Sequence, residues 1–544
     1  MVHSLEIRTW ICLVLFILIL LLPFFLRSPQ SITDDSAVPL VIISPHNEAI
    51  RYEFGRAFER WHHEKHGKPV LVDWRNIGGT SEISRYLSSQ FSAAFKAAWI
   101  EDGHPWNQSI AQAFNNPKIN PRDEKLPKEV REARIGFLVS DVGIGIDLFF
   151  GGGEYDHSRQ AAMGQIVPSG FAFTPEAGEI LGKAIPQKIS GEKWFDPDDT
   201  WYGVTVSSFG ICYNLDSLQK AGMVKEPQTW ADLGNPQLFR KVALADPTKS
   251  GSAAKAFEMV IQQAMAKATA GLPEDSTRFN EALSLGWAEG LGIIQAAAAN
   301  ARYFSDSASK VPMDVALGDA AAGMCIDFYG MFQADLVSRP DGSSRMKYVS
   351  PMGGTTVGCD PIAMLRGAPH PDLALEFIRF VLSMEGQRLW AFRSGTPGGP
   401  ERYSLQRLPI RRDFYTADNL QNCSNPEMNP FQLAGSFTYH AEWTGKLFAA
   451  IRSLVRAMCL DTGDELRAAW HEIILSGGPE ACPEAMAALK CLPPNATYSQ
   501  IPVTISAIRS KVDEIRLMRD WSLFFRGQYR QVRDLTQRVR LSSS

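Results

Sequence analysis

Short apolar runs alternate with helically spaced apolar positions along the first third of the chain. Residues 39–44 (PLVIIS) form a nearly continuous apolar run that predicts a buried strand, and apolar side chains then recur at helical spacing from about residue 48 to 66. A second strand is expected at 69–74, and the glycine-rich stretch 78–81 opens another helix. Because strands and helices alternate, the pattern is typical of an α/β fold.

The alternation continues to about residue 412, with one interruption. Residues 92–135 are rich in Pro, Asn and mixed charge, and they predict an inserted surface excursion. From 413 onward strand signals are sparse, so we expect a mostly helical C-terminal extension, 413–544, that ends in a basic amphipathic stretch at 511–540. Further strands are expected at 147–150, 203–214, 242–244, 323–328 and 355–365, and further helices at 251–270, 277–299, 371–383 and 385–393.

The N-terminus carries a strongly apolar segment. Residues 10–26 contain no charge and lie between Arg8 and Arg27. Their length is at the short end of a membrane-spanning helix, and the same run is compatible with the apolar core of a cleaved signal peptide. We expect residues 1–37 to form a membrane anchor or a signal segment with a linker, and we favour an uncleaved transmembrane helix in the cytoplasmic membrane.

Composition limits the classes of partner. A length of 544 residues predicts two or three compact units. The formal net charge is −4, and the charged residues are well mixed along the chain. Because the chain as a whole has no strong charge bias, nucleic acid is not an expected partner.

The eight cysteines fall into groups. Cys212, Cys325 and Cys359 lie in short apolar runs and are expected to be buried core residues. Four others fall after residue 412, and an even set within one segment suggests disulfides and an oxidising compartment. Of the three possible pairings we favour Cys482 with Cys491 and Cys423 with Cys459.

Four loops share one chemical property. Residues 44–47, 78–81, 151–154 and 246–253 each follow a predicted strand and supply small, hydroxyl or histidine residues where a helix is expected to begin. Unpaired N–H groups and the helix dipole favour an anionic group at such positions. Ligands of open α/β sheets bind beyond the carboxyl ends of the strands, so the four loops together indicate a binding site.

The chain resembles a known family over about residues 39–412. The stretches that carry the resemblance include VIISPHNEAIRYEFGRAFE, DLFFGGGEYD, WYGVTVSSFGICYNLDSL and NARYFSDSASKVPMDVALGDAAAGMCIDFYG. Their order and spacing are similar to those of type 2 periplasmic binding proteins, the extracellular solute-binding proteins of family 1 of ABC importers, in the branch usually described as iron(III)-binding.

This resemblance implies a two-lobed fold with hinge strands. The two strands that cross between the α/β lobes are then expected near 208–213 and 356–361. Lobe one would comprise 39–208 and 357–412, and lobe two 209–356, closing over a solute like a hinge. The expected partners are the permease and ATPase subunits of an ABC importer and a small-molecule solute. The bulk of the chain would lie outside the cytoplasmic membrane, as a monomer.

The resemblance also suggests ligand residues. Iron-binding members hold the metal with a histidine, a glutamate and two adjacent tyrosines. His46 matches the histidine and Glu154 lies near the expected carboxylate, but the tyrosine pair is replaced by Phe328 and Tyr329. Because phenylalanine cannot ligate a metal, Fe(III) with a synergistic anion, held by His46 and Tyr329, is the alternative ligand rather than the favoured one.

The anion-binding part of the family's site is better preserved. Residues 250–253 match the phosphate-binding turn, so we expect a small anionic, phosphorylated or carboxylated solute. Tyr202, Tyr303 and Tyr329 are candidates to stack on it or hydrogen-bond to it. The residues expected to contact the solute are Ser44, His46, Asn47, Gly79, Thr80, Gly152, Gly153, Glu154, Tyr202, Ser250, Gly251, Ser252, Asn300, Tyr303, Asp327 and Tyr329.

Two further function classes stay open at this stage. A hydrolase acting on a phosphorylated solute would use His46 and Glu154 as acid and base, but the sequence has no G-x-S-x-G elbow, phosphate-binding P-loop or dinucleotide fingerprint. No catalytic residue or resident cofactor is therefore predicted, and the chain is not expected to be an enzyme. A sensory or scaffolding module on the same fold is the other alternative, suggested by the helical extension.

Overall fold

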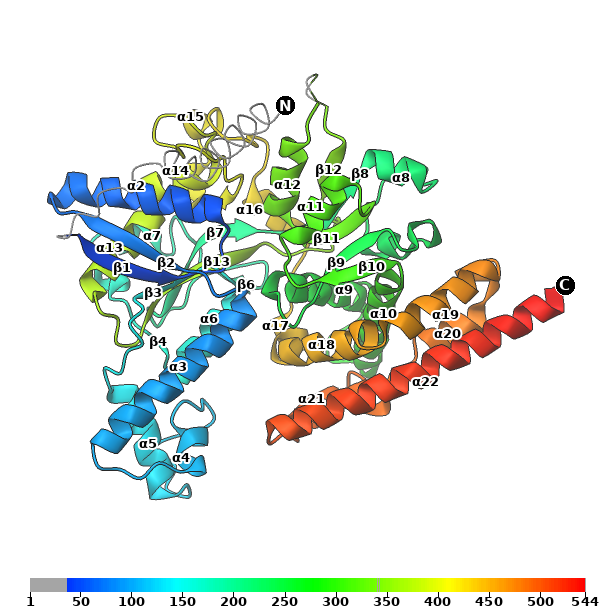
Figure 1. Cartoon of the computed structure of the whole chain (residues 1–544), viewed down its shortest axis with the longest axis horizontal. Coiled ribbons are helices and arrows are strands. Elements are labelled where there is room, and N and C mark those ends of the chain that lie inside the picture. The colour runs from blue at the N-terminus through cyan, green and yellow to red at the C-terminus, as the bar shows by residue number, and fades with distance from the viewer. Residues whose placement is uncertain (1–36, 340, 342, 544) are drawn as a thin grey trace, which may run out of the picture.

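Two β-sheets lie side by side and organise most of the chain in the computed structural model, which describes residues 37–339, 341 and 343–543 (Figure 1). The first sheet has the strand order β14-β7-β13-β3-β1-β2, and β4 pairs with β13. It is mixed, because β1 runs parallel to β2 and β3 whereas β13 runs antiparallel to β3, β4 and β7. Its strands are β1 (Val38–Ile43), β2 (Val70–Arg75), β3 (Leu148–Phe150), β4 (Ile166–Val167), β7 (Trp201–Ser207), β13 (Gly358–Leu365) and β14 (Leu408–Pro409).

The second sheet is also mixed and has the order β10-β9-β11-β8-β12. In it β9 runs parallel to β10 and β11, and β8 runs antiparallel to β11 and β12. A separate hairpin, β5 (Lys188–Ile189) and β6 (Glu192–Lys193), lies outside both sheets. The strands of the second sheet are β8 (Phe209–Asn214), β9 (Val242–Ala245), β10 (Ala301–Ser305), β11 (Ala322–Ile326) and β12 (Met346–Val349).

The chain passes between the sheets twice. The single strand expected at 203–214 divides at Ser208, so that β7 lies in the first sheet and β8 in the second. The return runs through residues 350–357 into β13, and the Phe209 N–H donates to Thr355 Oγ1 at 2.9 Å where the two crossings meet. Below, the first sheet with its helices is the first lobe, and the second sheet with its helices is the second lobe.

The ends of helix α2 in the first lobe are determined by local sequence. Asn47 caps it by accepting the Ile50 N–H, and Gly67 ends it in the left-handed conformation, so it spans the predicted residues 48–66. It buries Phe54 and Phe58 against the sheet. The helices of the first lobe are α2 (Glu48–His66), α3 (Thr80–Glu101), α4 (Gln108–Ala113), α5 (Lys128–Val139), α6 (Glu154–Met163), α7 (Ala177–Ile180), α13 (Pro371–Leu382) and α14 (Met384–Ala391).

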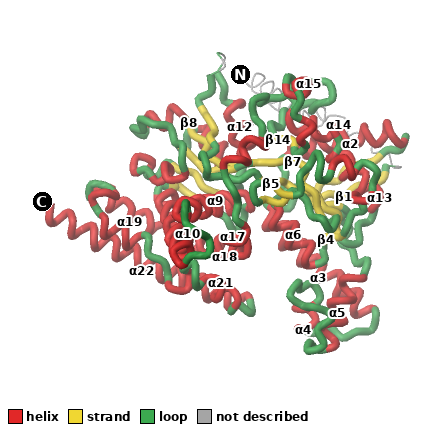
Figure 2. Tube along the Cα trace, turned by 180° about the vertical axis from the view of Figure 1, so that it is seen from behind, coloured by secondary structure: helices red, strands yellow, loops and turns green. Residues whose placement is uncertain are grey.

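Helices α3, α4 and α5 project from the first sheet as an arm (Figures 1 and 2). Phe95, Phe114 and Phe137 pack in it with ring centroids 5.0 to 5.3 Å apart, which gives the arm its own aromatic core. The excursion expected at 92–135 corresponds to this arm, although α3 continues without a break through residue 92.

Two long helices, α9 and α10, pack together in the second lobe. Ser250 caps α9 by accepting the Ala253 N–H at 3.2 Å. The predicted helices 251–270 and 277–299 therefore form almost as expected. The helices of this lobe are α8 (Leu215–Lys220), α9 (Gly251–Thr269), α10 (Thr277–Ala299), α11 (Lys310–Leu317) and α12 (Asp327–Leu336).

The C-terminal extension, residues 413–543, is helical: residues 413–431 pack on the first lobe beside α14, and the helices from α17 onward pack mainly on the second lobe (Figure 1). Trp470 Nε1 donates to Asn300 Oδ1 at 2.8 Å, and Trp287 Nε1 donates to the Ala496 carbonyl at 3.1 Å. Its hydrophobic residues are continuous with the core of the second lobe. Its helices are α15 (Ala417–Leu420), α16 (Pro430–Leu433), α17 (Ala441–Thr444), α18 (Phe448–Val455), α19 (Gly463–Leu475), α20 (Pro483–Leu489), α21 (Ile501–Ser506) and α22 (Lys511–Ser543).

The structure corrects the predicted disulfides. Cys423, Cys459, Cys482 and Cys491 are all free thiols. Cys482 and Cys491 flank α20, and at about 1.5 Å rise per residue they lie on the order of 12 Å apart, well beyond the span of a disulfide. Cys423 packs with Phe392 and Phe414 in a small cluster, whereas Cys459 lies in the main core.

The predicted N-terminal anchor, residues 1–37, lies almost entirely outside the described residues. Within the part of the chain that is described, no helix combines the length and apolar character that a bilayer crossing requires.

Candidate functional site

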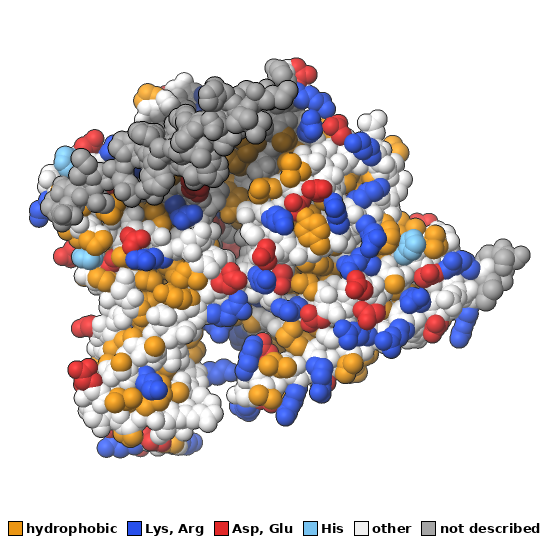
Figure 3. All heavy atoms as spheres, viewed as in Figure 1, with side chains coloured by type: hydrophobic (Ala, Val, Ile, Leu, Met, Phe, Trp, Pro, Cys, Tyr) orange, Lys and Arg blue, Asp and Glu red, His pale blue; other side chains and the backbone are white. Residues whose placement is uncertain are grey.

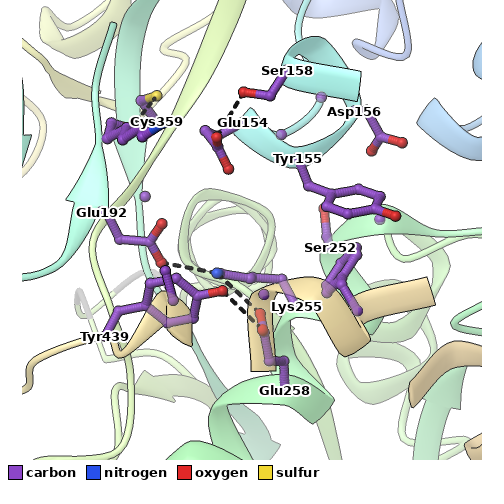
Figure 4. A pocket seen from close by; sticks show the side chains of 18 of the residues that line it. Glu154, Tyr155, Asp156, Ser158, Glu192, Ser252, Lys255, Glu258, Cys359 and Tyr439 are labelled. Atoms are coloured by element: carbon purple, nitrogen blue, oxygen red, sulfur yellow. Dashed lines mark hydrogen bonds and ion pairs between the residues drawn. The ribbon is translucent and has the colours of Figure 1, made fainter. Parts of the chain in front are cut away.

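A cavity of about 540 Å³ lies between the two lobes (Figure 4). The first lobe contributes Thr80, residues 152–156 and Glu192, and the second contributes Gly251, Ser252, Lys255 and Glu258. The crossing strands contribute Ser207 and residues 358–360. A third wall comes from the extension, whose cavity-lining residues include Tyr439, Glu442, Lys446 and Phe448.

The glycine-rich loops meet at this cavity because they lack side chains. A Cβ at Gly152 would lie 2.7 Å from Thr80 Cγ2, and Gly152 has a φ of +103°, in the left-handed region. A Cβ at Gly79 would lie 2.7 Å from the carbonyl oxygen of Lys249, so first and second lobes approach backbone to backbone here. The loops predicted at 78–81, 151–154 and 246–253 therefore converge.

Two helices begin at the cavity from opposite lobes. Gly153 and Glu154 open α6, and Gly251 and Ser252 open α9. The first N–H groups of a helix have no partner one turn earlier, and the aligned peptide dipoles add a partial positive charge there. Both helix ends therefore favour an anionic group in the cavity.

A buried lysine joins the two lobes beneath the cavity (Figure 4). Lys255 of α9 forms ion pairs with Glu192 at 2.9 Å and Glu258 at 3.0 Å, and its ammonium lies 3.6 Å from the centroid of the Tyr439 ring. Burial alone would lower the pKa of Lys255, but the two carboxylates raise it well above its usual value. The lysine is therefore charged, and its single positive charge is shared between the two acids.

Two other carboxylates of the cavity have ion-pair partners, whereas Glu154 accepts a hydrogen bond from Ser158 Oγ and has no cationic partner among the described residues. Asp360 pairs with Arg407 at 2.7 Å, and Glu442 pairs with His440 at 2.9 Å. Burial raises the pKa of Asp156, which favours its neutral form. By contrast, the three cavity lysines at positions 188, 193 and 446 have no ion-pair partner among the described residues. Three lysines and one glutamate, Glu154, thus line the cavity without an ion-pair partner among the described residues.

His46 does not lie in an environment suited to Fe(III). Its Nε2 is 3.4 Å from Arg407 Nη1, and this guanidinium is fully buried, 4.1 Å from the centroid of the Phe328 ring. Burial lowers the pKa of His46, with Asp360 opposing the shift. A permanently charged arginine beside the imidazole repels a trivalent cation. The described residues also contain no cluster of three or more His, Cys, Asp or Glu side chains that could hold a metal ion.

Several residues expected in the site have structural roles instead. Asn300 donates to the carbonyls of Leu233 and Asn235, and it accepts from Trp470. The hydroxyls of Tyr202 and Tyr303 donate to Asp199 and Asp314, respectively. These three residues lie outside the cavity lining, which corrects the prediction that they face the solute.

Five other predicted residues do not line the cavity but have structural roles close to it. Ser44 Oγ accepts the His46 N–H, and Asn47 and Ser250 are helix caps. Asp327 accepts from the Ser208 N–H at 2.7 Å beside the crossing strand, and burial raises its pKa to about 6. Tyr329 stacks against Phe328 with centroids 4.2 Å apart, and burial raises its pKa to about 12. Of the predicted set, Thr80, Gly152, Gly153, Glu154, Gly251 and Ser252 line the cavity.

Comparison with known proteins decides the family. Residues 140–419, just over half of the chain, match the family described as bacterial extracellular solute-binding protein. The chain belongs to this family. Its members are non-catalytic, extracytoplasmic receptors of ABC importers, so the family predicted from the sequence is confirmed. The extension, including every cavity residue after 419, lies beyond the matched segment.

Individual relatives are distant from this solute-binding protein. An uncharacterized protein of Haemophilus influenzae is 26% identical over 250 residues, which span 46% of this chain and 61% of that protein. The phosphoglycerate transport regulatory protein PgtC of Salmonella typhimurium is 23% identical over 361 residues, or 66% of this chain and 77% of PgtC. The structure of iron-bound HitA from Pseudomonas aeruginosa is 15% identical and covers 77% of this chain and 99% of HitA, with a TM-score of 0.43.

Sequence reasoning did not identify several residues that line the cavity or lie beside it. Lys255 was passed over because it lies within a helical repeat, although it follows the phosphate-binding turn by one helical turn on the same face. Arg407 stands in a short apolar run, where a buried arginine has no recognisable spacing. Tyr439 and Phe448 belong to the extension, and no local pattern connects the extension with loops about 200 residues or more away.

His157 should make this protein sensitive to mild acid. The imidazole is fully buried against Phe149, and burial lowers its pKa to about 4. Between pH 6.5 and 4 the unfolded chain takes up a proton at His157 that the folded chain does not, so stability falls as pH falls. We expect a loss of about 3 kcal/mol across this window from His157. In urea unfolding at several pH values, His157→Gln should flatten the dependence, whereas His63→Gln, at an exposed position, should not. An unchanged slope in His157→Gln would contradict the assignment.

Proposed function

We propose that this receptor captures a small organic anion, phosphorylated or carboxylated, in the cavity between the lobes and delivers it to an ABC permease. The observation that carries the proposal is the meeting of the α6 and α9 N-termini at one cavity. Backbone N–H groups from both lobes then bind one anionic group, so binding favours the closed arrangement.

The size and lining of the cavity support an organic solute over a bare ion. A volume of about 540 Å³ lies within the usual range for small-molecule sites, roughly 300 to 1,000 Å³. Tyr155, Tyr439 and Phe448 supply aromatic surface, and the rings of Tyr155 and Phe448 lie 4.7 Å apart at their centroids. These side chains suit the body of a molecule whose anionic group occupies the helix ends.

The charged residues of the cavity and the relative PgtC both support an anionic solute. The lysines at 188, 193 and 446 carry unpaired positive charge near the cavity, whereas Glu192, Glu258 and Asp360 each have a cationic partner. The relative PgtC takes its name from phosphoglycerate transport, a phosphorylated and carboxylated solute. We place delivery to permease and ATPase subunits, and anchoring through the N-terminal segment, in the same proposal.

The test is binding of the purified full chain to a panel of solutes, followed by thermal unfolding and calorimetry. The panel contains sugar phosphates, phosphoglycerates, dicarboxylates, polyamines and Fe(III). A solute at 100 times its Kd stabilises the folded chain by about 2.7 kcal/mol. We expect a phosphorylated or carboxylated compound to bind, and Lys446→Gln to weaken it about tenfold, since an unpaired cation at the cavity is lost.

Lys267→Gln, at an exposed site on α9 outside the cavity, is the matched control and should leave the affinity unchanged. Stabilisation by Fe(III) or a polyamine alone would refute the anionic class. Equal affinity in wild type and Lys446→Gln would show that the solute does not use this wall of the cavity.

A further inference from the structure

A second hollow lies on the other side of Asp156 from the solute cavity. It measures about 920 Å³ and runs between α3 and α6 of the first lobe and α18, α21 and α22 of the extension. Asp156 lines both hollows and so lies at their common wall. Six cationic side chains line this second hollow, which we call the basic groove: Arg85, Arg159, Arg452, Arg456, Lys511 and Arg519.

The basic groove carries more positive than negative charge. Its only acidic lining residues among those described are Asp156, Asp461 and Glu514. Asp461 pairs with Arg456 at 3.3 Å and Glu514 pairs with Lys511 at 2.7 Å. Figure 3 shows Lys and Arg side chains gathered along the gap between the arm and the extension.

Two arginines of the first lobe lack a partner. Within the described residues, neither Arg85 nor Arg159 has a carboxylate within ion-pair distance, although both line the basic groove. Serine hydroxyls at positions 84, 88, 453 and 522 line it as well. Guanidinium groups and hydroxyls together are the donors that bind phosphate in proteins.

Arg452 of the extension interacts electrostatically with the arginines that the first lobe places in the basic groove. It donates from Nε to the Pro247 carbonyl at 2.8 Å and from Nη2 to Ser81 Oγ, so it contacts both lobes from the extension. Burial lowers the pKa of Arg452, and the positive charges of Arg159 and Arg85 lower it further, against the opposing effect of Asp156. The first lobe and the extension thus present like charges to each other.

We propose that the basic groove binds a phosphate-bearing anion through Arg85 and Arg159 of the first lobe, with Arg452 of the extension adding to the positive field. The cations of the first lobe and of the extension repel each other, and an anion bound between them attracts both. The site is separate from the solute cavity, and its existence does not depend on the proposed solute. Bound anion stabilises the contact between the first lobe and the extension.

The experiment measures binding of inorganic phosphate to the full chain by calorimetry at constant ionic strength, with chloride as the reference anion. In a second arm, co-sedimentation compares phosphatidylglycerol with phosphatidylcholine vesicles, because a lipid headgroup carries the same chemistry. The test variant is Arg85→Gln/Arg159→Gln. The control is Arg530→Gln/Arg533→Gln, a pair of exposed arginines of α22 outside the basic groove.

Saturable binding that weakens at least about tenfold in the test variant, but not in the control, supports the proposal. Loss of binding only to phosphatidylglycerol vesicles in the test variant also supports it and identifies a headgroup as the source. Phosphate binding that is instead lost in Lys446→Gln overturns it, because the anion then occupies the solute cavity. No binding in either arm overturns it as well, and that result does not bear on the organic solute of the cavity.

Discussion

Replacing Arg407 with methionine is expected to lower the free energy of unfolding by about 4 kcal/mol. The guanidinium is fully buried and pairs with Asp360 at 2.7 Å and with Ser207 Oγ at 2.8 Å. Burial alone would raise the pKa of Asp360, but the Arg407 charge and His46 hold it below its usual value. Methionine preserves most of the volume and leaves Asp360 as a buried charge with only the His46 imidazole beside it. Urea unfolding followed by circular dichroism measures the loss.

The double variant Arg407→Met/Asp360→Asn separates charge from packing. Because it removes both partners, it should recover most of the stability that the single variant loses. Arg402→Met, at an exposed position close by, is the control and should change stability by less than about 0.5 kcal/mol. A cost below about 1 kcal/mol in Arg407→Met would mean that Asp360 is solvated or protonated, and the argument against a ferric site at His46 would lose its basis.

Phe525→Ala is expected to cost about 4 kcal/mol, as for other large-to-small substitutions in a tightly packed core. Phe525 is fully buried in α22 and stacks with Tyr529 at a centroid distance of 6.1 Å. Tyr529 in turn accepts a hydrogen bond from Gln295 of α10 at 3.2 Å. Because the extension and the second lobe share one core, hydrogen exchange should accelerate in α10 and α19 together.

Leu523, two positions before Phe525, offers a matched control. Its side chain is 57% exposed, so Leu523→Ala should leave both stability and exchange nearly unchanged. Faster exchange in Phe525→Ala that is confined to α22 would contradict a shared core. In that case the extension would be a separate unit that merely rests against the second lobe.

A shared core has a consequence for the solute site. Tyr439 and Phe448 are carried by the extension, which contacts both lobes: Tyr439 donates to Glu258 of the second lobe, and α18 packs on α9. Contacts of the extension with the first lobe near the cavity include Tyr439 N–H to the Ser190 carbonyl at 2.8 Å and Arg452 to Ser81. Opening of the cavity must break these contacts, which adds to the cost of releasing a solute.

The sequence by itself determined the secondary structure and the family. Apolar periodicity places α2, α9 and α10 within one residue of their observed bounds, and Asn47 and Ser250, which were expected to contact the solute, cap α2 and α9. These features depend on residues within one or two helical turns of each other, so they can be read from a single chain. The glycine-rich loops were likewise recognisable, because close backbone approach requires glycine at positions such as 79 and 152.

Only the tertiary structure decided what completes the site. Arg407 reaches His46 across 361 positions of the chain, and Arg452 reaches Ser81 across 371. The free cysteines 482 and 491 were close in sequence but are held apart by α20. The local sequence pattern determines which helices and strands form. Burial, ion pairing and the walls of the cavity depend on which distant elements pack together. That packing is determined by the energy of the whole core.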